Sequence, residues 1–261
     1  MGFAALVPRR RPNEAWLLAI PALLFLIAPF IALVFATPWA HFSLDRGDWS
    51  AIGVSLGYGA CAMLLVIALG TPFAWWLART HFPARWIADA IVLLPLLSPP
   101  LALGIVLETL YGPYGAAGAP LARLGLLLTN SAPAFVLALT YGALPFFVVL
   151  ARAAFEGVSP EYEALARTLG KSQPTIFFTV TLPLARVGLG AALAIAWVRA
   201  LGEFGICLIV AYFPMGIPVR IWVNLQDVGL GAVFPLLWVF YLVALPLPLW
   251  LGLRAQRRGI A

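Results

Sequence analysis

Two oppositely charged residues interrupt an apolar stretch in the last third of the chain, and they are the first candidates for chemistry. Arg199 and Glu203 lie four residues apart, so on a helix their side chains are neighbours and can form an ion pair. Ionisable groups in an apolar span are costly, and they usually face a partner or an aqueous cavity. Two interpretations stay open: the pair only neutralises itself, or it shapes a gate or a subunit contact.

A dense set of prolines forms a second unusual pattern. The run Leu94-Pro-Leu-Leu-Ser-Pro-Pro-Leu-Ala-Leu-Gly104 contains Pro95, Pro99 and Pro100, and each proline removes a backbone N–H from the hydrogen-bond ladder of a helix. Irregular backbone inside a membrane is tolerated only where protein buries it or where it lines a wet cavity. The run therefore indicates either a position on a permeation route or a simple packing kink.

Residues 155–183 form a polar interval that predicts two short helices. Ser159 can cap the first helix, and Glu161 and Glu163 fall in its first turn, where acidic side chains are stabilised by the positive end of the helix. Gly170 can supply the left-handed residue that ends this helix. The result is a pair of helices at an angle to each other.

The second helix of this interval is expected to begin near Ser172 and to stop near Pro183. On the first helix, four side chains fall on one face at helical spacing: Tyr162, Leu165, Ala166 and Leu169. Apolar side chains on an otherwise charged loop predict a docking surface. The alternative is a helix that lies on lipid or on the protein's own spans.

The chain is not predicted to bind ATP. Gly170-Lys171-Ser172 is similar to the end of a phosphate-binding loop, but that motif also requires a glycine at position 165, which is leucine. The run also lacks a preceding buried strand. Energy for any transport must therefore come from a partner protein.

Enzymatic and metal chemistry are not expected either. An intramembrane enzyme needs paired aspartates, a serine with a base, or a histidine cluster, whereas His41 and His81 fall in loops and Asp89 stands alone near the edge of a span. Cys61 and Cys207 have no metal-ligand spacing. The sequence predicts no catalytic residue, no metal site and no cofactor in this chain.

The segments that position these residues are membrane spans. Of the 261 residues, 63% are hydrophobic and only 10% are charged, whereas soluble domains are roughly 45–50% apolar and about 25% charged. A span needs about 20 apolar residues, and six stretches qualify: 15–37, 51–78, 86–108, 132–154, 184–212 and 232–253. We expect an all-α membrane protein with about six transmembrane helices.

The basic residues predict the orientation, because cytoplasmic loops are enriched in Lys and Arg. The net charge of +6 does not indicate nucleic-acid binding, since these residues fall between apolar runs and not on one solvated face. With the amino terminus inside the cell, three basic residues are outside, Arg46, Arg123 and Arg220. Twelve are then cytoplasmic: Arg9, Arg10, Arg11, Arg79, Arg85, Arg152, Arg167, Lys171, Arg186, Arg254, Arg257 and Arg258.

A single transmembrane domain is expected over residues 15–253, with a cytoplasmic amino terminus at 1–14 and a cytoplasmic tail at 254–261. The first stretch follows three arginines, as a signal peptide would, but its apolar part is too long for one and favours a retained anchor. The 155–183 interval is too short to bury a core of its own. No separate soluble domain is expected.

The 155–183 interval resembles the cytoplasmic signature loop of ABC importer permeases, which has a Glu-Ala-Ala stretch, a glycine, nine further residues and then Ile-x-Leu-Pro. The matching residues are Glu163, Ala164, Ala166 and Gly170, followed by Val180-Thr-Leu182-Pro183. Leu165 and Val180 depart from the pattern but keep its apolar character. The resemblance implies a type I permease fold in which this loop enters a cleft on an ATPase subunit, with Glu163, Ala166 and Gly170 as coupling residues.

Two other segments resemble permeases for molybdate, tungstate and sulfate. The Leu-Pro-Leu-x-x-Pro-Pro stretch with its later glycine matches at Pro95, Pro99, Pro100 and Gly104, and Leu201-Gly-Glu-Phe-Gly205 is similar to a run that follows the signature loop. Residues 211–218 depart from the asparagine-containing loop of those permeases. The likeness covers about residues 51–252 and implies a pathway for a small oxyanion.

Taken together, the resemblance implies a binding-protein-dependent importer in the inner membrane of a prokaryote. The expected partners are cytoplasmic ABC ATPase subunits, a second permease subunit in a homodimer, an extracytoplasmic substrate-binding protein and the lipid bilayer. Alternative substrates that share the signature loop are thiamine, polyamines and ferric iron. A bare carboxylate is a poor ligand for an oxyanion, so Glu203 is not predicted to bind the substrate.

Overall fold

A computed structural model describes residues 12–251, and every regular element in that range is helical. The predicted all-α class is confirmed. Contacts along the backbone divide the chain into two compact units, the first ending at Ser43 and the second beginning at Leu44. Six of the basic residues used for the orientation lie outside the described residues: Arg9, Arg10, Arg11, Arg254, Arg257 and Arg258.

The first unit is built on one long apolar helix, α1 (Pro12–Ala36), followed by the short turn η1 (Trp39–His41). The stretch Leu18–Ala36 is long and apolar enough to cross a membrane, and none of it is buried inside the protein. An apolar surface of this size needs lipid or another protein to cover it. The predicted first span, 15–37, agrees with this helix.

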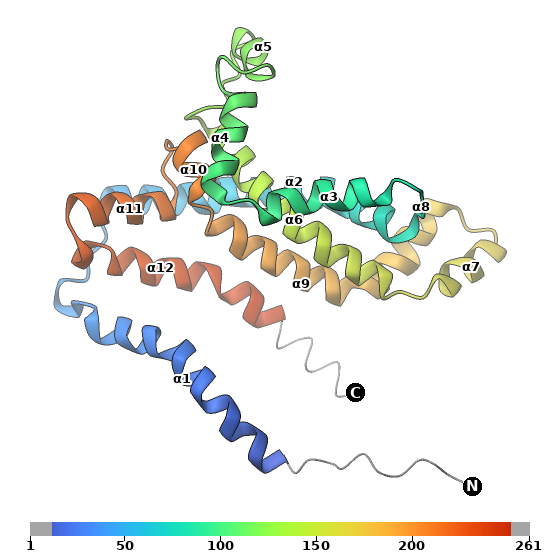
Figure 1. Cartoon of the computed structure of the whole chain (residues 1–261), viewed down its shortest axis with the longest axis horizontal. Helices are drawn as coiled ribbons and strands as arrows, with labels where there is room; N and C mark the ends of the chain where they lie inside the picture. The colour runs from blue at the N-terminus through green and yellow to red at the C-terminus, as the bar shows by residue number, and fades with distance from the viewer. Residues whose placement is uncertain (1–11, 252–261) are drawn as a thin grey trace. The chain divides into compact units, whose positions relative to one another are not determined.

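Three long helices form the centre of the second unit: α2 (Arg46–Arg79), α6 (Ala132–Glu156) and α9 (Leu182–Leu201). They run side by side (Figure 1). Their contacts include many small side chains, which let helix backbones approach closely in a membrane. The fully buried alanines of these three helices are Ala62, Ala74, Ala134, Ala138, Ala143, Ala151, Ala192, Ala196 and Ala200. Gly70 serves the same purpose, because a Cβ atom there would lie 2.6 Å from Phe147 Cδ1.

The third predicted span, 86–108, is a broken helix, as the prolines within it predict. It consists of α3 (Arg85–Leu97) and α4 (Pro100–Tyr111), which meet at an angle of 114°. Pro99 and Pro100 lack an N–H and push the residue before each of them out of the helical region, and Ser98 is extended, with ψ at 140°. The prolines therefore break the helix, as expected, but they also redirect the chain.

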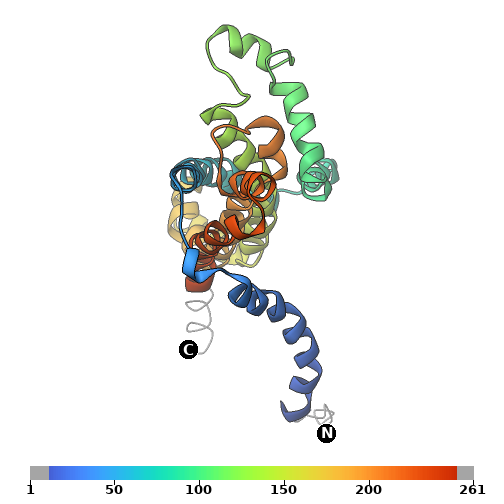
Figure 2. The same ribbon diagram turned by 90° about the vertical axis from the view of Figure 1, so that its left-hand side faces the viewer.

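After this break, α4 leaves the bundle formed by α2, α6 and α9, and it leads to the short helix α5 (Gly118–Arg123) at the tip of a projecting arm (Figure 2). Several large side chains of the arm are exposed, including Leu101, Ile105 and Val106. This apolar surface is available to lipid or to a second protein chain.

Within the 155–183 interval, α7 (Pro160–Thr168) is followed by α8 (Gln173–Ile176), the π-helical turn η2 (Phe177–Thr181) and then α9. The second short helix begins as predicted, but the expectation that it stops near Pro183 is wrong. The N–H of Leu182 bonds to the carbonyl of Phe177, five residues back. Pro183 therefore does not end the helix, because the wider π-helical turn before it carries the chain into α9.

The fifth apolar helix runs from Gln173 to Leu201, so the predicted span of 184–212 begins too late and ends too late. It stops at Gly202, and α10 (Gly205–Val210) is a separate short helix that packs against α4. The chain continues through α11 (Ile217–Asp227), η3 (Leu230–Ala232) and α12 (Phe234–Ala244).

The last apolar segment spans Leu230–Leu251, close to the predicted 232–253. In the described part of the chain, five helices are long and apolar enough to cross a membrane, or six when α3 and α4 are taken as one broken span. The prediction of about six transmembrane helices is confirmed.

A polar cluster ties α11 to the first turn of α2. Asp48, which is 4% exposed, accepts hydrogen bonds from Arg220 and from the side chain of Asn224, each at 3.0 Å. Arg220 also pairs with Asp45 at 2.5 Å. About two turns further along α2, the hydroxyl of Ser55 accepts the N–H of Ile217 at 2.8 Å. These bonds fix the position of α11 relative to the bundle.

Candidate functional site

The first candidate site is helix α7 with the turn that follows it. The hydroxyl of Ser159 accepts the N–H of Glu161, and Gly170 adopts a φ of +74°. Both residues therefore act as the sequence predicts, because Ser159 starts the helix and Gly170 supplies the left-handed conformation that a side chain would strain. The N–H of Gly170 bonds to the carbonyl of Arg167 at 2.9 Å and closes the turn.

The carboxylate of Glu163 points into the protein. Its residue is only 2% exposed, and Oε1 accepts hydrogen bonds from Arg79 Nε at 2.9 Å and from the hydroxyl of Thr181 at 2.8 Å. Arg79 also donates to the carbonyl of Val158 at 2.9 Å. One buried carboxylate therefore connects the end of α2, helix α7 and the π-helical turn that leads into α9.

The outer face of α7 is apolar. Tyr162, Leu165 and Leu169 are 56%, 62% and 73% exposed, and Ala164 is exposed beside them. Ala166, which the spacing places in the same stripe, is buried at 9% exposure. The helix thus has one face that packs on its own chain, through Glu163 and Ala166, and one that is open to a partner.

The remaining residues of the signature motif lie where this loop joins the bundle. Leu182 is the first residue of α9 and is partly buried, and Pro183 follows it on the surface. Arg79 and Thr181 were not identified as site residues from the sequence. The sequence shows Arg79 only as a basic residue near the end of a span. No sequence pattern connects it with Glu163, which is 84 positions away.

The second candidate site is a cavity of about 310 Å³ where two breaks in the helices meet. It brings together four of the residues predicted for the pathway, Pro99, Pro100, Arg199 and Glu203. The other lining residues are Leu101, Gly202, Phe204 and Gly205. Two predicted residues do not line it: Pro95 lies inside α3, and Gly104 packs against Ile209 of α10.

Arg199 and Glu203 form the predicted ion pair, with Nη1 and Oε2 separated by 2.5 Å. Arg199 lies in the last turn of α9, and Glu203 follows the end of that helix, so the pair is at a helix break and not inside a continuous span. The other carboxylate oxygen of Glu203 accepts the N–H of Ile206 at 2.9 Å and so supports the start of α10.

Neighbouring residues of α6 shape the surroundings of this pair. Gly142 leaves room for the carboxylate, because a Cβ atom there would lie 2.7 Å from Glu203 Oε2. The guanidinium of Arg199 stands over the ring of Phe146, 5.4 Å from its centre, which is within the range of a cation–π interaction.

The two breaks are held together by glycine contacts. A Cβ atom on Gly205 would lie 2.6 Å from Pro100 Cβ and 2.8 Å from the backbone nitrogen of Leu101. We expect Gly205→Ala to separate α10 from α4, to reduce stability by about 1–3 kcal/mol and to alter the cavity. Thermal unfolding in detergent measures the effect.

Gly57→Ala is the matched control for this change. Gly57 also lies on a membrane helix, but a Cβ atom there meets nothing within 4 Å. Its alanine variant is expected to unfold at or above the temperature of the original protein, since alanine favours helix. Equal unfolding temperatures for Gly205→Ala and the original chain would contradict the tight contact.

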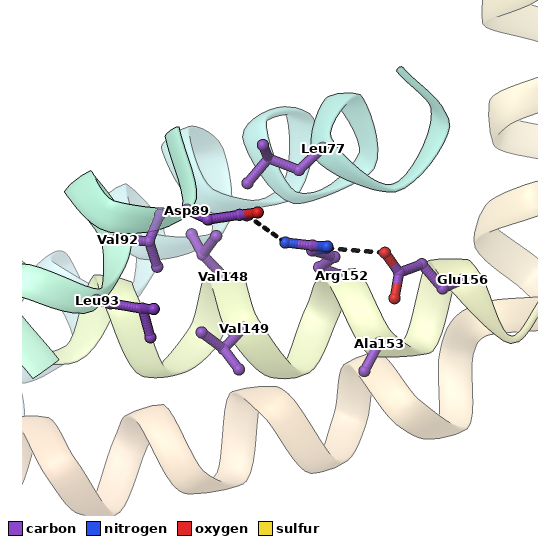
Figure 3. A pocket seen from close by; sticks show the side chains of 9 residues that line it. All are labelled: Leu77, Asp89, Val92, Leu93, Val148, Val149, Arg152, Ala153 and Glu156. Carbon is purple, nitrogen blue, oxygen red and sulfur yellow. Dashed lines mark hydrogen bonds and ion pairs between the residues drawn. The ribbon is translucent and has the colours of Figure 1, made fainter. Parts of the chain in front are cut away.

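A second cavity, of about 380 Å³, lies between α3 and α6 and contains a group of charged side chains (Figure 3). Arg152 bonds to Asp89 at 2.5 Å and to Glu156 at 2.8 Å, and Arg85 bonds to the same oxygen of Glu156 at 3.1 Å. Asp89 therefore has a basic partner in the structure. Its partner lies 63 positions away, so sequence spacing gives no sign of the pair.

Within residues 12–251, no group of three or more His, Cys, Asp and Glu side chains is arranged to hold a metal ion. The cysteines of that range, Cys61 and Cys207, are unpaired, and Cys207 is buried. The absence of a cofactor stays a prediction from the sequence.

Comparisons with known proteins give consistent matches. Residues 70–258 match the family described as "Binding-protein-dependent transport system inner membrane component". A probable molybdenum ABC transporter permease protein of Haloferax volcanii is 40% identical over 250 residues, which cover 93% of this chain and 90% of that protein. The molybdenum transport system permease protein ModB of Mycobacterium tuberculosis is 32% identical over 213 residues, covering 80% and 81% of the two chains.

The fold also matches solved structures. A chain of a bacterial alginate ABC transporter, crystallised with an alginate-bound periplasmic protein, has a TM-score of 0.73 and covers 93% of this chain and 94% of its own length at 18% identity. A chain of an amino acid ABC transporter has a TM-score of 0.58 and covers 82% of this chain and 99% of its own length at 16% identity. At these identities the likeness concerns the fold alone.

Proposed function

The chain belongs to the family of binding-protein-dependent transport system inner membrane components, and from this premise we propose that it forms the membrane pathway through which an ABC importer takes up molybdate or tungstate. The observation that carries the substrate is the likeness, over most of the chain, to proteins named as molybdenum permeases. None of the relatives named above is a sulfate permease, so sulfate serves as a comparison anion in the test.

The same proposal includes the partners of the chain. Two copies form the pathway between them, each binds an ATPase subunit on the cytoplasmic side, and an extracytoplasmic binding protein delivers the anion. The unburied apolar helix α1 and the exposed apolar side chains of α4 support a second copy, because such surfaces need a cover of lipid or protein.

The positions of the basic residues support cytoplasmic termini. Arg79 and Arg85 bond to residues of the 155–158 region, close to Arg152, at one end of the bundle. Arg220, assigned to the outside, pairs with Asp45 at the opposite end of α2. These four arginines lie at the two ends of the bundle according to their assignments, and in this proposal the end with the larger predicted set is the cytoplasmic side.

The two faces of α7 have different roles in this proposal. Tyr162, Leu165 and Leu169 enter the ATPase cleft, while Glu163, held by Arg79 and Thr181, passes the movement to α2 and α9. ATP-driven closure of the ATPase subunits draws the two loops together and rocks the bundles as rigid bodies. The cavity between the two copies then opens outward to the binding protein.

Transport by the reconstituted complex tests the function. The permease, its ATPase and its binding protein are placed in proteoliposomes with internal ATP, and uptake of molybdate, tungstate, sulfate, a polyamine, thiamine and ferric iron is measured. Saturable uptake of molybdate or tungstate, with ATP hydrolysis stimulated by the loaded binding protein, is the expected result. Stimulation by a polyamine-loaded, thiamine-loaded or iron-loaded binding protein, without response to either oxyanion, contradicts the proposed substrate.

A further inference from the structure

The cavity at the two helix breaks has only one cationic side chain in its wall. Its lining is otherwise apolar or backbone, apart from the carboxylate of Glu203. The side chain of Arg199 is 23% exposed, whereas that of Glu203 is fully buried. A solute that enters the cavity therefore meets the guanidinium and not the carboxylate.

The guanidinium has donors to spare. An arginine presents five N–H groups in a planar fork that suits tetrahedral oxyanions. The ion pair with Glu203 engages Nη1, and no hydrogen bond to another described residue takes up Nη2 or Nε. The charge of Arg199 is thus neutralised by Glu203, but several of its N–H groups have no acceptor among the described residues.

The side of the carboxylate that faces Arg199 has no further partner. Glu203 Oε2 is buried and lies 2.5 Å from Nη1, and no other described residue donates a hydrogen bond to it. An anion that reaches the guanidinium competes with Oε2 for the same positive charge, since both present negative oxygens. Oε1 stays anchored by the N–H of Ile206.

We propose that Arg199 is the contact for the transported oxyanion in the pathway, and that Glu203 is its resident counter-ion, which the anion displaces from the guanidinium. The assignment rests on the proposed function, since it takes the passing solute to be an oxyanion. The amino-terminal end of α4, at Pro100 and Leu101, opens onto the same cavity and adds partial positive charge.

This arrangement explains how a charged site can avoid trapping its ligand. A conducting site must attract the ion enough for entry and release it easily. A bare arginine in an apolar wall would hold a dianion tightly, because charge-assisted hydrogen bonds are strong where water is scarce. The carboxylate of Glu203 competes with the anion and lowers the affinity to one that allows passage.

Equilibrium binding of radiolabelled molybdate to the purified permease–ATPase complex, without the binding protein, tests the proposal. Glu203→Gln keeps an oxygen for the N–H of Ile206 but removes the competing charge, so binding should tighten by about tenfold or more. Maximal uptake should fall in the same variant, because release becomes slow. Arg199→Gln should abolish the tight binding when it is combined with Glu203→Gln.

A second variant keeps the proposal testable if Glu203→Gln fails to fold. In Gly142→Ala the new methyl group would lie 2.7 Å from Glu203 Oε2 and so forces that oxygen to shift, while the charge is retained. Binding of molybdate should again tighten, by a smaller factor. Gly57→Ala, which meets no neighbour, should leave binding unchanged.

A purely structural ion pair gives a different pattern. In that case Glu203→Gln and Gly142→Ala lower the unfolding temperature without tightening molybdate binding, and the proposal is overturned. Tight binding that persists in the Arg199→Gln and Glu203→Gln double variant overturns it as well. If the unaltered complex transports no oxyanion, the proposed function fails together with this assignment, whereas normal molybdate uptake with unaltered binding in the variants rejects the assignment alone.

Discussion

Replacing Gly170 with proline is expected to abolish uptake while the protein still inserts into the membrane. Gly170 has a φ of +74°, whereas proline fixes φ near −65° and has no N–H to donate, so the variant also loses the bond to the carbonyl of Arg167. The turn between α7 and α8 cannot form, and the exposed stripe of α7 is presented at a different angle. Uptake by the reconstituted complex should fall by at least tenfold. A tenfold weaker association of the loop with the ATPase, which corresponds to about 1.4 kcal/mol, is enough for this effect.

Gly170→Asn is the control for this change, because asparagine tolerates the left-handed conformation better than other residues. It should retain most of the uptake and most of the ATPase association. Membrane fractionation checks that both variants insert equally. Normal transport by Gly170→Pro would show that this turn has no part in coupling.

Glu163→Arg is expected to uncouple ATP hydrolysis from uptake. The substitution places a third positive charge beside Arg79 and Arg167 and removes the acceptor of Thr181. Breaking a buried ion pair by removing one partner typically costs about 3–5 kcal/mol, and here the loss is confined to the junction of α2, α7 and η2. The complex should hydrolyse ATP without a response to the loaded binding protein, and uptake should be lost.

The reciprocal exchange distinguishes a positional role from a general loss of structure. Combining Glu163→Arg with Arg79→Glu restores opposite charges at the same contact, so part of the stimulated hydrolysis should return. Glu161→Arg, an exposed change on the same helix, should have little effect. If Glu163→Arg, the double variant and Glu161→Arg all lose stimulated ATP hydrolysis to the same extent, the Arg79–Glu163 contact is irrelevant. The loss then means that α7 tolerates no basic residue in its first turn.

The features that sequence alone predicted correctly are those decided by local chemistry. Ser159 and Gly170 mark the start and end of α7 because a hydroxyl cap and a left-handed glycine act within a few residues. The Arg199–Glu203 pair follows from helical spacing in the same way. The long apolar stretches predicted the number of spans, since length and hydrophobicity decide whether a helix can cross lipid.

The extents of the broken spans could not be predicted, because the average hydropathy of each segment stays high across its break. Pro99 and Pro100 at Ser98, and the Arg199–Glu203 pair at Gly202, mark the two places but do not show where the chain goes next. Only packing decides the direction after each break, namely the contact of Gly104 with Ile209 and of Gly205 with Pro100. The expected stop at Pro183 is absent because a π-helical turn at Phe177–Thr181 carries the chain past it, and the proline alone does not predict that turn.

Pairs between distant parts of the chain were missed altogether. Arg79 meets Glu163, and Asp89 meets Arg152, across separations that carry no sequence signal. The charges themselves were visible, but each was interpreted by its local position as a basic flank or an isolated acid. Only the arrangement of the helices in space shows which charge neutralises which.

The unbroken passage of the 173–181 segment into α9 has a mechanical consequence. Gln173–Leu201 is one helix of 29 residues, about 40 Å long, with the turn that follows α7 at its near end and Arg199 at its far end. A tilt of about 10° around the near end swings the far end by about 7 Å at that length, which exceeds the reach of a hydrogen bond. A small change of tilt at the end near α7 is therefore enough to make or break a contact of Arg199.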